Sequence, residues 1–360
     1  MSEDELPEAD RVPGAPHPRH ASEVIGHAAA IESFLTAAHS GRLHHGWLIT
    51  GPRGTGKATL AWALARWLLS EAPGSGLQLP PDDPVLRRIA ALSEPRLSLI
   101  RRPVDEKTGR LRSEITVEEI RRLLSFFHMS AAEGGRRIAI IDAADDMNPS
   151  AANALLKILE EPPKGAVIFL ISHQPARLLP TIRSRCRELR LSPLSTAEIG
   201  HILAGLDAPG DPDKLAALSG GSVGEALRLT GQDGIALYQR IVDLFEHPAR
   251  MDRRKAAAIA DLAAGRPGAS GDPFDLTMTL LDRFLSRAAI AGLLGPPLPE
   301  AAEGEAEVLA RMSPDDQSAR IWATAQAELS ARARTGRAVN LDPSALVLDM
   351  LIGLANQPAT

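Results

Sequence analysis

The chain has 360 residues, 44% of them hydrophobic and 24% charged, and a formal net charge of −5. This length suits two or three domains of an ordinary globular protein, and the net charge excludes an overall basic field for nucleic acid. Any DNA contact must therefore be local. The single cysteine, Cys186, excludes an internal disulfide and favours a reducing compartment, so we expect a cytoplasmic protein.

Residues 1–20 are acidic and proline-rich and contain no apolar core. They match neither a signal peptide nor a membrane span, and we expect a disordered tail. The segment from Val24 to His27 then precedes a helix that contains Ile31 and Leu35.

A glycine-rich loop follows the short apolar run from Trp47 to Thr50. It matches the phosphate-loop pattern G-x-x-x-x-G-K in the strand–loop–helix context that this pattern requires. Glycines let backbone N–H groups face a phosphate, the helix start adds a positive dipole end, and the lysine supplies a mobile charge. We therefore assign a nucleotide-binding site, intact or vestigial, to Gly51, Gly54, Gly56, Lys57 and Thr59.

One ligand of that pattern is missing. The position after the lysine should carry a hydroxyl that helps to hold Mg²⁺, and here it is Ala58. Thr59 lies about 100° further round the helix, so it cannot simply replace that hydroxyl. The sequence leaves both ATP binding and Mg²⁺ binding open.

Two β-branched runs, Ile138–Ile141 and Ala166–Ile171, are typical of strands buried on both faces of a parallel sheet. Between them, Asn148 can cap a helix whose first residue is Pro149, and Pro162 begins the pair of prolines that ends it. The unit is therefore a βαβ module.

The residues that end these two strands are Asp142 and Ser172. Because α/β sheets bind ligands at the carboxyl ends of their strands, both join the candidate nucleotide site. Upstream, Leu97–Arg101 is predicted to be a strand, and Thr116 with Glu119 forms a capping box that starts a helix.

Two strings resemble the clamp-loader branch of the AAA+ proteins: Asn153-Ala-Leu-Leu-Lys-Ile-Leu-Glu-Glu-Pro-Pro163 and Ser184-Arg185-Cys186. Within this branch the chain most resembles the delta-prime family of the bacterial DNA polymerase III clamp loader. Motifs carry the resemblance from Glu23 to Leu229; beyond that, only length and composition do. It implies an α/β fold, with an AAA+ P-loop domain whose parallel sheet is covered by helices, then a small helical lid and an all-α collar.

We expect a P-loop NTPase-like domain over residues 21–192, a lid over 193–232 and a collar or oligomerisation domain over 233–360. Ser195 and Glu198 make a capping box at the start of the lid. The later apolar runs have a helical period without strand-like alternation, so a plain helical bundle is the alternative to a collar.

The resemblance implies a rigid stator that does not hydrolyse ATP. In AAA+ ATPases a glutamate usually follows the strand-end aspartate and orients the attacking water; here Ala143 follows. Asp145 and Asp146 lie further on and are not expected to reach the site. The position aligned with the sensor arginine of the lid is Gly224, and Arg228 is a weak substitute.

The same match makes Arg185 an arginine finger that acts in trans on a neighbour's ATP. Arginine suits this role because it stays charged and its planar fork fits phosphate oxygens. The alternative is a solvated turn that also contains Arg183 and Arg187. Ser172 resembles the family's sensor of the γ-phosphate, or is only a structural hydroxyl, and the segment Val24–His27 lies beside the adenine in relatives.

The implied partners are the delta and gamma/tau subunits in a hetero-pentameric ring, and through it the sliding clamp and primer–template DNA in replication, with no membrane. The isolated chain is not expected to be an enzyme, although the DNA polymerase III holoenzyme as a complex is a DNA-directed DNA polymerase. The alternatives are a catalytically active AAA+ ATPase subunit of a loader and an interaction protein that keeps a dead phosphate loop.

Many relatives carry a cysteine-based zinc module after the phosphate-loop helix. The corresponding stretch, Glu71 to Glu94, contains no cysteine, whereas a tetrahedral structural site needs four ligands. We therefore predict no zinc and a proline- and glycine-rich loop in place of the module, and we assign no residues as metal ligands.

Overall fold

The computed structural model describes residues 8–12, 15–71, 73–105, 107–128, 135–247, 251–268 and 271–357. The chain divides into two compact units, Met1–Leu194 and Ser195–Thr360. This boundary lies two residues from the one that the sequence predicts, while the further division into lid and collar stays a prediction.

The first unit is built on a five-stranded sheet in the order β2-β3-β4-β1-β5, with every neighbouring pair parallel. The strands are β1 (Gly46–Thr50), β2 (Leu97–Arg101), β3 (Arg137–Asp142), β4 (Ala166–Ser172) and β5 (Arg187–Arg190). The predicted strands are confirmed to within two residues at each end. β5 was not predicted.

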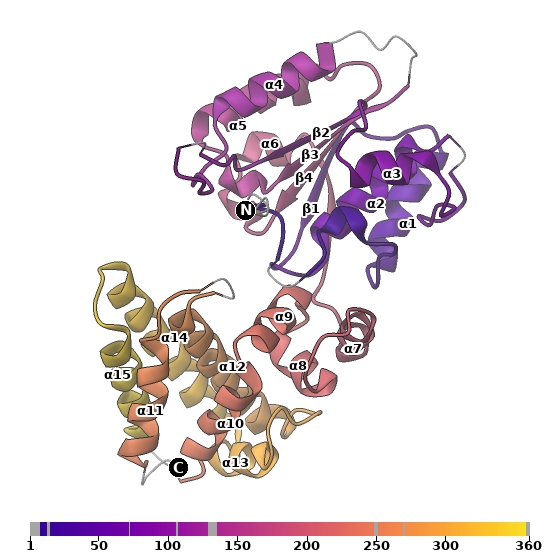
Figure 1. Ribbon diagram of the computed structural model, residues 1–360. Helices are drawn as coiled ribbons and strands as arrows, with labels where there is room; N and C mark the ends of the chain where they lie inside the picture. Colours follow the sequence, from indigo (N-terminus) through magenta and orange to yellow (C-terminus); the bar gives the residue numbers. More distant parts are fainter. Residues whose placement is uncertain are drawn as a thin grey trace, which may run out of the picture. The chain divides into compact units, whose positions relative to one another are not determined.

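Helices cover both faces of this sheet (Figure 1). One face carries α1 (Ala28–His39), α2 (Lys57–Leu69) and α3 (Pro84–Ala90); the other carries α4 (Val117–His128), α5 (Pro149–Glu160) and α6 (Pro180–Arg183). Side chains of the central strands alternate between the two cores: Ile138 and Ile140 join the first, Ala139 and Ile141 the second. The sheet is thus buried on both sides, and its carboxyl edge is left for a site.

Capping residues lie at the starts of α4 and α5, where the sequence predicts these helices to begin. Asn148 Oδ1 accepts from Ala151 N at the start of α5, which has Pro149 at its first position. Glu119 accepts from Thr116 N before α4. Such caps satisfy N–H groups that lack a partner inside the helix.

One of two expectations about irregular segments needs correction. Residues 8–12 and 15–20 are not a disordered tail: they pack on the first unit and include the 3₁₀ helix η1 (Pro18–His20). The rest of that predicted tail lies outside the described residues. The proline- and glycine-rich loop predicted after α2 agrees with the structure, which has no helix or strand in residues 73–83; α3, capped by Asp83, begins where that loop ends.

The regular elements described in the second unit are all helices. They are α7 (Thr196–Gly205), α8 (Pro212–Ser219), α9 (Val223–Gly231), α10 (Gly234–Leu244), α11 (Arg253–Ala263), α12 (Pro273–Leu294), α13 (Glu305–Met312), α14 (Asp316–Ala338) and α15 (Pro343–Ala355). α7 starts with the predicted capping box of Ser195 and Glu198. A buried ion pair, Arg287 to Glu305 at 2.6 Å, joins α12 to α13. Among the described residues, no helix combines the length and the apolarity needed to cross a membrane.

Candidate nucleotide site and arginine-bearing turn

The glycine loop joins β1 to α2, as the pattern requires. Gly51, Gly54 and Gly56 have φ of +145°, +74° and +90°, which side chains rarely tolerate. At Gly51 a Cβ would also come within 2.5 Å of Leu191 O. The loop therefore needs glycine for its path, whether or not it holds a phosphate.

The hydroxyl that braces this loop comes from a residue that sequence reasoning did not single out. Thr55 is fully buried and donates to Pro52 O at 2.9 Å. Lys57 is 3% exposed and donates to the same carbonyl oxygen. Thr59 lies one residue beyond Ala58, half-buried in the first turn of α2. The lysine and the loop are thus preformed at a helix N-terminus, a favourable place for an anion.

Lys57 and Asp142 interact across the carboxyl edge of the sheet. Burial lowers the pKa of Lys57 to about 8, against the opposing charges of Asp142 and Asp145. Burial raises the pKa of Asp142 to about 7, with a further rise from Asp10 and an opposing effect from Lys57. The two predicted site residues are therefore brought together.

Ser172 does reach this edge, but its hydroxyl is engaged. It donates to Asp145 Oδ1 at 2.7 Å, and Asp145 Oδ2 accepts from His173 N at 2.5 Å. The expectation that Asp145 does not reach the site is wrong, because the 3₁₀ turn η2 (Ala144–Asp146) returns its carboxylate to the end of β4. Asp146 instead pairs with Arg102 at 3.1 Å.

These residues fit a phosphate group better than the usual magnesium ion. The glycines, Lys57 and the α2 N-terminus are in place for phosphate oxygens. The metal side is incomplete: Ala58 presents a methyl group where a hydroxyl belongs, and Ala143 follows Asp142. Asp145, the extra carboxylate at this edge, is held by three residues of the β4 end: Ser172, His173 and Gln174.

The N-terminal segment forms one flank of the site. Asp10 has a fully buried side chain, lies 2.9 Å from His17 Nε2 and also pairs with Arg101 at the end of β2. His17 packs edge-on against Trp62 of α2, with ring centroids 5.7 Å apart. Since Asp10 adds to the rise in the pKa of Asp142, this segment belongs to the site's electrostatic surroundings.

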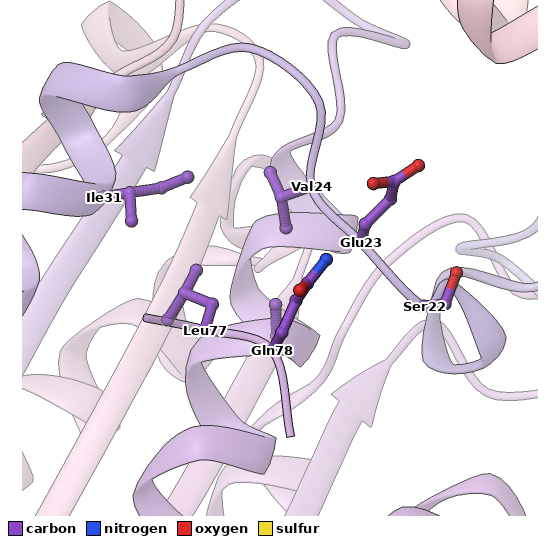
Figure 2. A pocket seen from close by; sticks show the side chains of 7 residues that line it. Ser22, Glu23, Val24, Ile31, Leu77 and Gln78 are labelled. Atoms are coloured by element: carbon purple, nitrogen blue, oxygen red, sulfur yellow. The ribbon is translucent and has the colours of Figure 1, made fainter. Parts of the chain in front are cut away.

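The segment before α1 also contacts the loop. His27 has φ of +60° and its Nε2 lies 2.8 Å from Thr55 O. Residues of the same segment and of α1 line a cavity of about 180 Å³, whose apolar lining includes Val24, Ile31 and Leu77 (Figure 2). α1, the helix predicted after this segment, buries Phe34 in the core of the first unit. A place for adenine stays a prediction.

Arg185 lies at the other end of β1. Its carbonyl oxygen would be 3.2 Å from a Cβ on Gly46, the first residue of β1, whereas the glycine loop follows the last residue. The guanidinium donates from Nη1 to Thr181 O at 3.1 Å and pairs through Nη2 with Glu160 Oε1 at 2.9 Å. It is 36% exposed. Cys186 beside it is partly buried, which raises its thiol pKa to about 12, in keeping with a packed residue.

In the second unit, Gly224 lies in the first turn of α9, where the resemblance would place a sensor arginine. Arg228 pairs with Glu225 on its own helix at 2.7 Å. The substitute sensor is thus engaged within its own unit.

The parallel sheet, the glycine loop between β1 and α2, and the polar ends of β3 and β4 define a P-loop domain of the AAA+ class. More particularly, residues 26–195 match the family described as "DNA polymerase III, delta subunit". The resemblance to the delta-prime family that the sequence predicts is confirmed by this match and by named relatives.

The DNA polymerase III subunit delta′ of Pseudomonas aeruginosa is 38% identical over 192 residues, which are 52% of this chain and 56% of that protein. The delta′ subunit of Bacillus subtilis is 33% identical over 208 residues, which are 57% and 60%. The tau subunit of Escherichia coli is 30% identical over 222 residues, which are 60% and 33%. The matched segment thus spans little more than half of the delta′ relatives.

Among solved structures, a gamma subunit-related protein of DNA polymerase III from Thermotoga maritima is 18% identical, with a TM-score of 0.34. That comparison covers 91% of this chain and 99% of that one.

Proposed function

We propose that this chain is a non-hydrolysing, stator-type delta-prime subunit of a bacterial clamp loader, one that supplies Arg185 in trans to a neighbouring ATPase subunit. The observation that carries the proposal is the position of Arg185 at the amino-terminal end of β1. Four residue steps of strand, about 13 Å at 3.3 Å each, separate that end from its own glycine loop. A partly exposed arginine so placed can meet a phosphate only on another subunit.

The loss of hydrolysis is supported by side chains that are absent or engaged. Ala58 and Ala143 supply neither a metal ligand nor a base. Asp145 is held by Ser172 and His173. A P-loop ATPase needs its metal and its water-positioning group to stabilise and attack the γ-phosphoryl group. We infer that in cis this chain has neither.

The proposed partners are those that the resemblance to the delta-prime family implies. We propose that the chain joins delta and gamma/tau subunits in a hetero-pentameric ring, and through the ring acts on the sliding clamp and primer–template DNA. The helical second unit, with its predicted collar, is the part assigned to assembly. In this role the chain is a subunit of the polymerase III holoenzyme and has no enzymatic activity of its own.

A second candidate is an active ATPase subunit of the same loader. Lys57 and the three loop glycines favour it, as does the partial match to a tau subunit. The two candidates differ in one measurement, the ATPase activity of the purified full chain. We expect negligible turnover under the proposal. Turnover comparable to that of the loader's ATPase subunits, abolished by Lys57→Ala, would establish the second candidate instead.

The finger is tested by Arg185→Ala in the reconstituted ring with clamp and primed DNA. Arginine fingers are worth about 10³ to 10⁵ in rate at a single site. Because one of several ring sites loses its finger, total ATPase falls partly, while clamp loading is crippled. Arg185→Lys should rescue poorly because an ammonium lacks the forked geometry. Arg183→Ala, an exposed neighbour in the same turn, is the matched control. Normal loading by an assembled Arg185→Ala ring would refute the finger.

A further inference from the structure

Two contacts from within the domain hold the guanidinium of Arg185. Nη1 donates to Thr181 O at 3.1 Å, and Nη2 pairs with Glu160 Oε1 at 2.9 Å. Thr181 belongs to α6, the short helix that precedes Arg185 in the chain. Glu160 is the last residue of α5. One terminal nitrogen is therefore held by the finger's own turn and the other by a separate element.

This arrangement leaves some N–H donors of the Arg185 guanidinium available to a ligand. A guanidinium carries five N–H donors, and these two contacts occupy one hydrogen on each terminal nitrogen. The remaining donors belong to a side chain that is 36% exposed as a whole. Two anchored nitrogens fix the plane of the guanidinium, and an oxyanion from outside can still accept from the free donors.

We propose that Glu160 is a positioning residue for Arg185, which fixes the orientation of the guanidinium before a neighbour's phosphate arrives. The inference rests on the proposed trans-acting function of Arg185. Arginine has high rotamer freedom, and an arginine held in its working orientation loses less of it on binding. Glu160 thus contributes through preorganisation, without touching the nucleotide.

The pair is suited to this role because it is open to solvent. Glu160 is 48% exposed, and ion pairs between exposed groups add little to folding stability. Removing Glu160 should therefore leave the fold intact while releasing the finger. The neighbouring Glu161 has the same charge and length, and it has no described contact with Arg185, so it is a matched control.

The test compares four full-length variants, Glu160→Ala, Glu160→Gln, Glu161→Ala and Arg185→Ala, and the double variant Glu160→Ala/Arg185→Ala. Each is assembled with the matching ring subunits, and DNA-stimulated ATPase and clamp loading are measured beside thermal unfolding. We expect Glu160→Ala to lower the loading rate about three- to tenfold, the cost of ordering one long side chain. Glu160→Gln keeps an acceptor oxygen and should recover part of the loss. Glu161→Ala should match the wild type.

The double variant separates the two proposals. If Glu160 acts only through Arg185, the double variant loads clamps at the rate of Arg185→Ala. A further loss in the double variant, or an unchanged or faster rate in Glu160→Ala alone, would overturn the positioning role while leaving the finger in place. If a ring that contains Arg185→Ala loads clamps at the wild-type rate, the proposed trans-acting function of Arg185 is itself refuted.

Discussion

Ser172, the last residue of β4, donates its hydroxyl hydrogen to Asp145 Oδ1 at 2.7 Å. The same carboxylate accepts from the backbone N–H of His173, so the side chain of Asp145 holds the end of β4 through two hydrogen bonds. The position that resembles a γ-phosphate sensor is thereby satisfied from within the domain. Burial lowers the pKa of the neighbouring His173 to about 4, so its ring is neutral at pH 7.

Asp145→Ala should destabilise the first unit by about 1 to 3 kcal/mol, the usual cost of leaving buried donors without an acceptor. Ser172→Ala should cost less, because Asp145 keeps the His173 N–H. Urea unfolding of both variants measures this order, with the exposed Asp82→Ala as control. A loss in Asp145→Ala no larger than in the control would show that this carboxylate does not secure the strand end.

The N-terminal segment offers a second test, through the buried carboxylate of Asp10. Arg101→Ala removes its cationic partner and leaves His17 Nε2 as its other close contact. Breaking a buried pair from one side costs on the order of 3 kcal/mol because the remaining charge is uncompensated. Adding Asp10→Asn should recover part of that loss, which denaturant midpoints would reveal. If the double variant is less stable than Arg101→Ala alone, the cluster is not held by this charge balance.

The fold was largely predictable because its signals are local. Buried parallel strands are apolar runs, and helix caps lie within three residues of the groups that they satisfy. β5 was missed for the opposite reason. It reads Arg-Glu-Leu-Arg, buries only Leu189 and pairs only with β1, so an edge strand there has no apolar pattern.

The site was predictable in part. The rule for carboxyl ends of parallel strands placed Lys57, Asp142 and Ser172 together. Contacts between residues far apart in sequence were not predictable. Asp10 reaches Arg101 across 91 positions, and Asp145 reaches Ser172 across 27. No spacing rule links such positions, so only the fold shows them.

A third prediction concerns metal. The stretch that takes the place of the zinc module contains no cysteine, and within the described residues no cluster of three or more His, Cys, Asp or Glu side chains is arranged to hold an ion. We expect tag-free protein to contain less than a stoichiometric amount of zinc, and EDTA to leave its melting temperature unchanged. Metal analysis that finds one tightly held zinc per chain would refute this.

The fourth prediction follows from the buried carboxyl of Asp142, whose pKa is raised from 3.8 to about 7. Below pH 3.8 the carboxyl is protonated in both the native and the unfolded state, and the stability that its neutral form contributes to the fold is fully present. Between pH 3.8 and about 7 the native state keeps the proton and the unfolded state releases it. The contribution to folding stability is therefore lost as pH rises through about 7. At pH 8 the native protein therefore carries a buried charge that Lys57 only partly offsets.

Asp142→Asn keeps the shape and removes the titration. We expect it to raise the melting temperature by about 3 °C or more at pH 8, the size of shift that 1 kcal/mol gives in a domain of this length. At pH 5 the gain should be smaller, because only part of the stability loss that runs from pH 3.8 to about 7 has occurred there. Asp82→Asn, at an exposed position, should show no such difference between the two pH values. An equal or larger gain at pH 5 would mean that Asp142 is charged there, and that Lys57 neutralises it far better than its burial suggests.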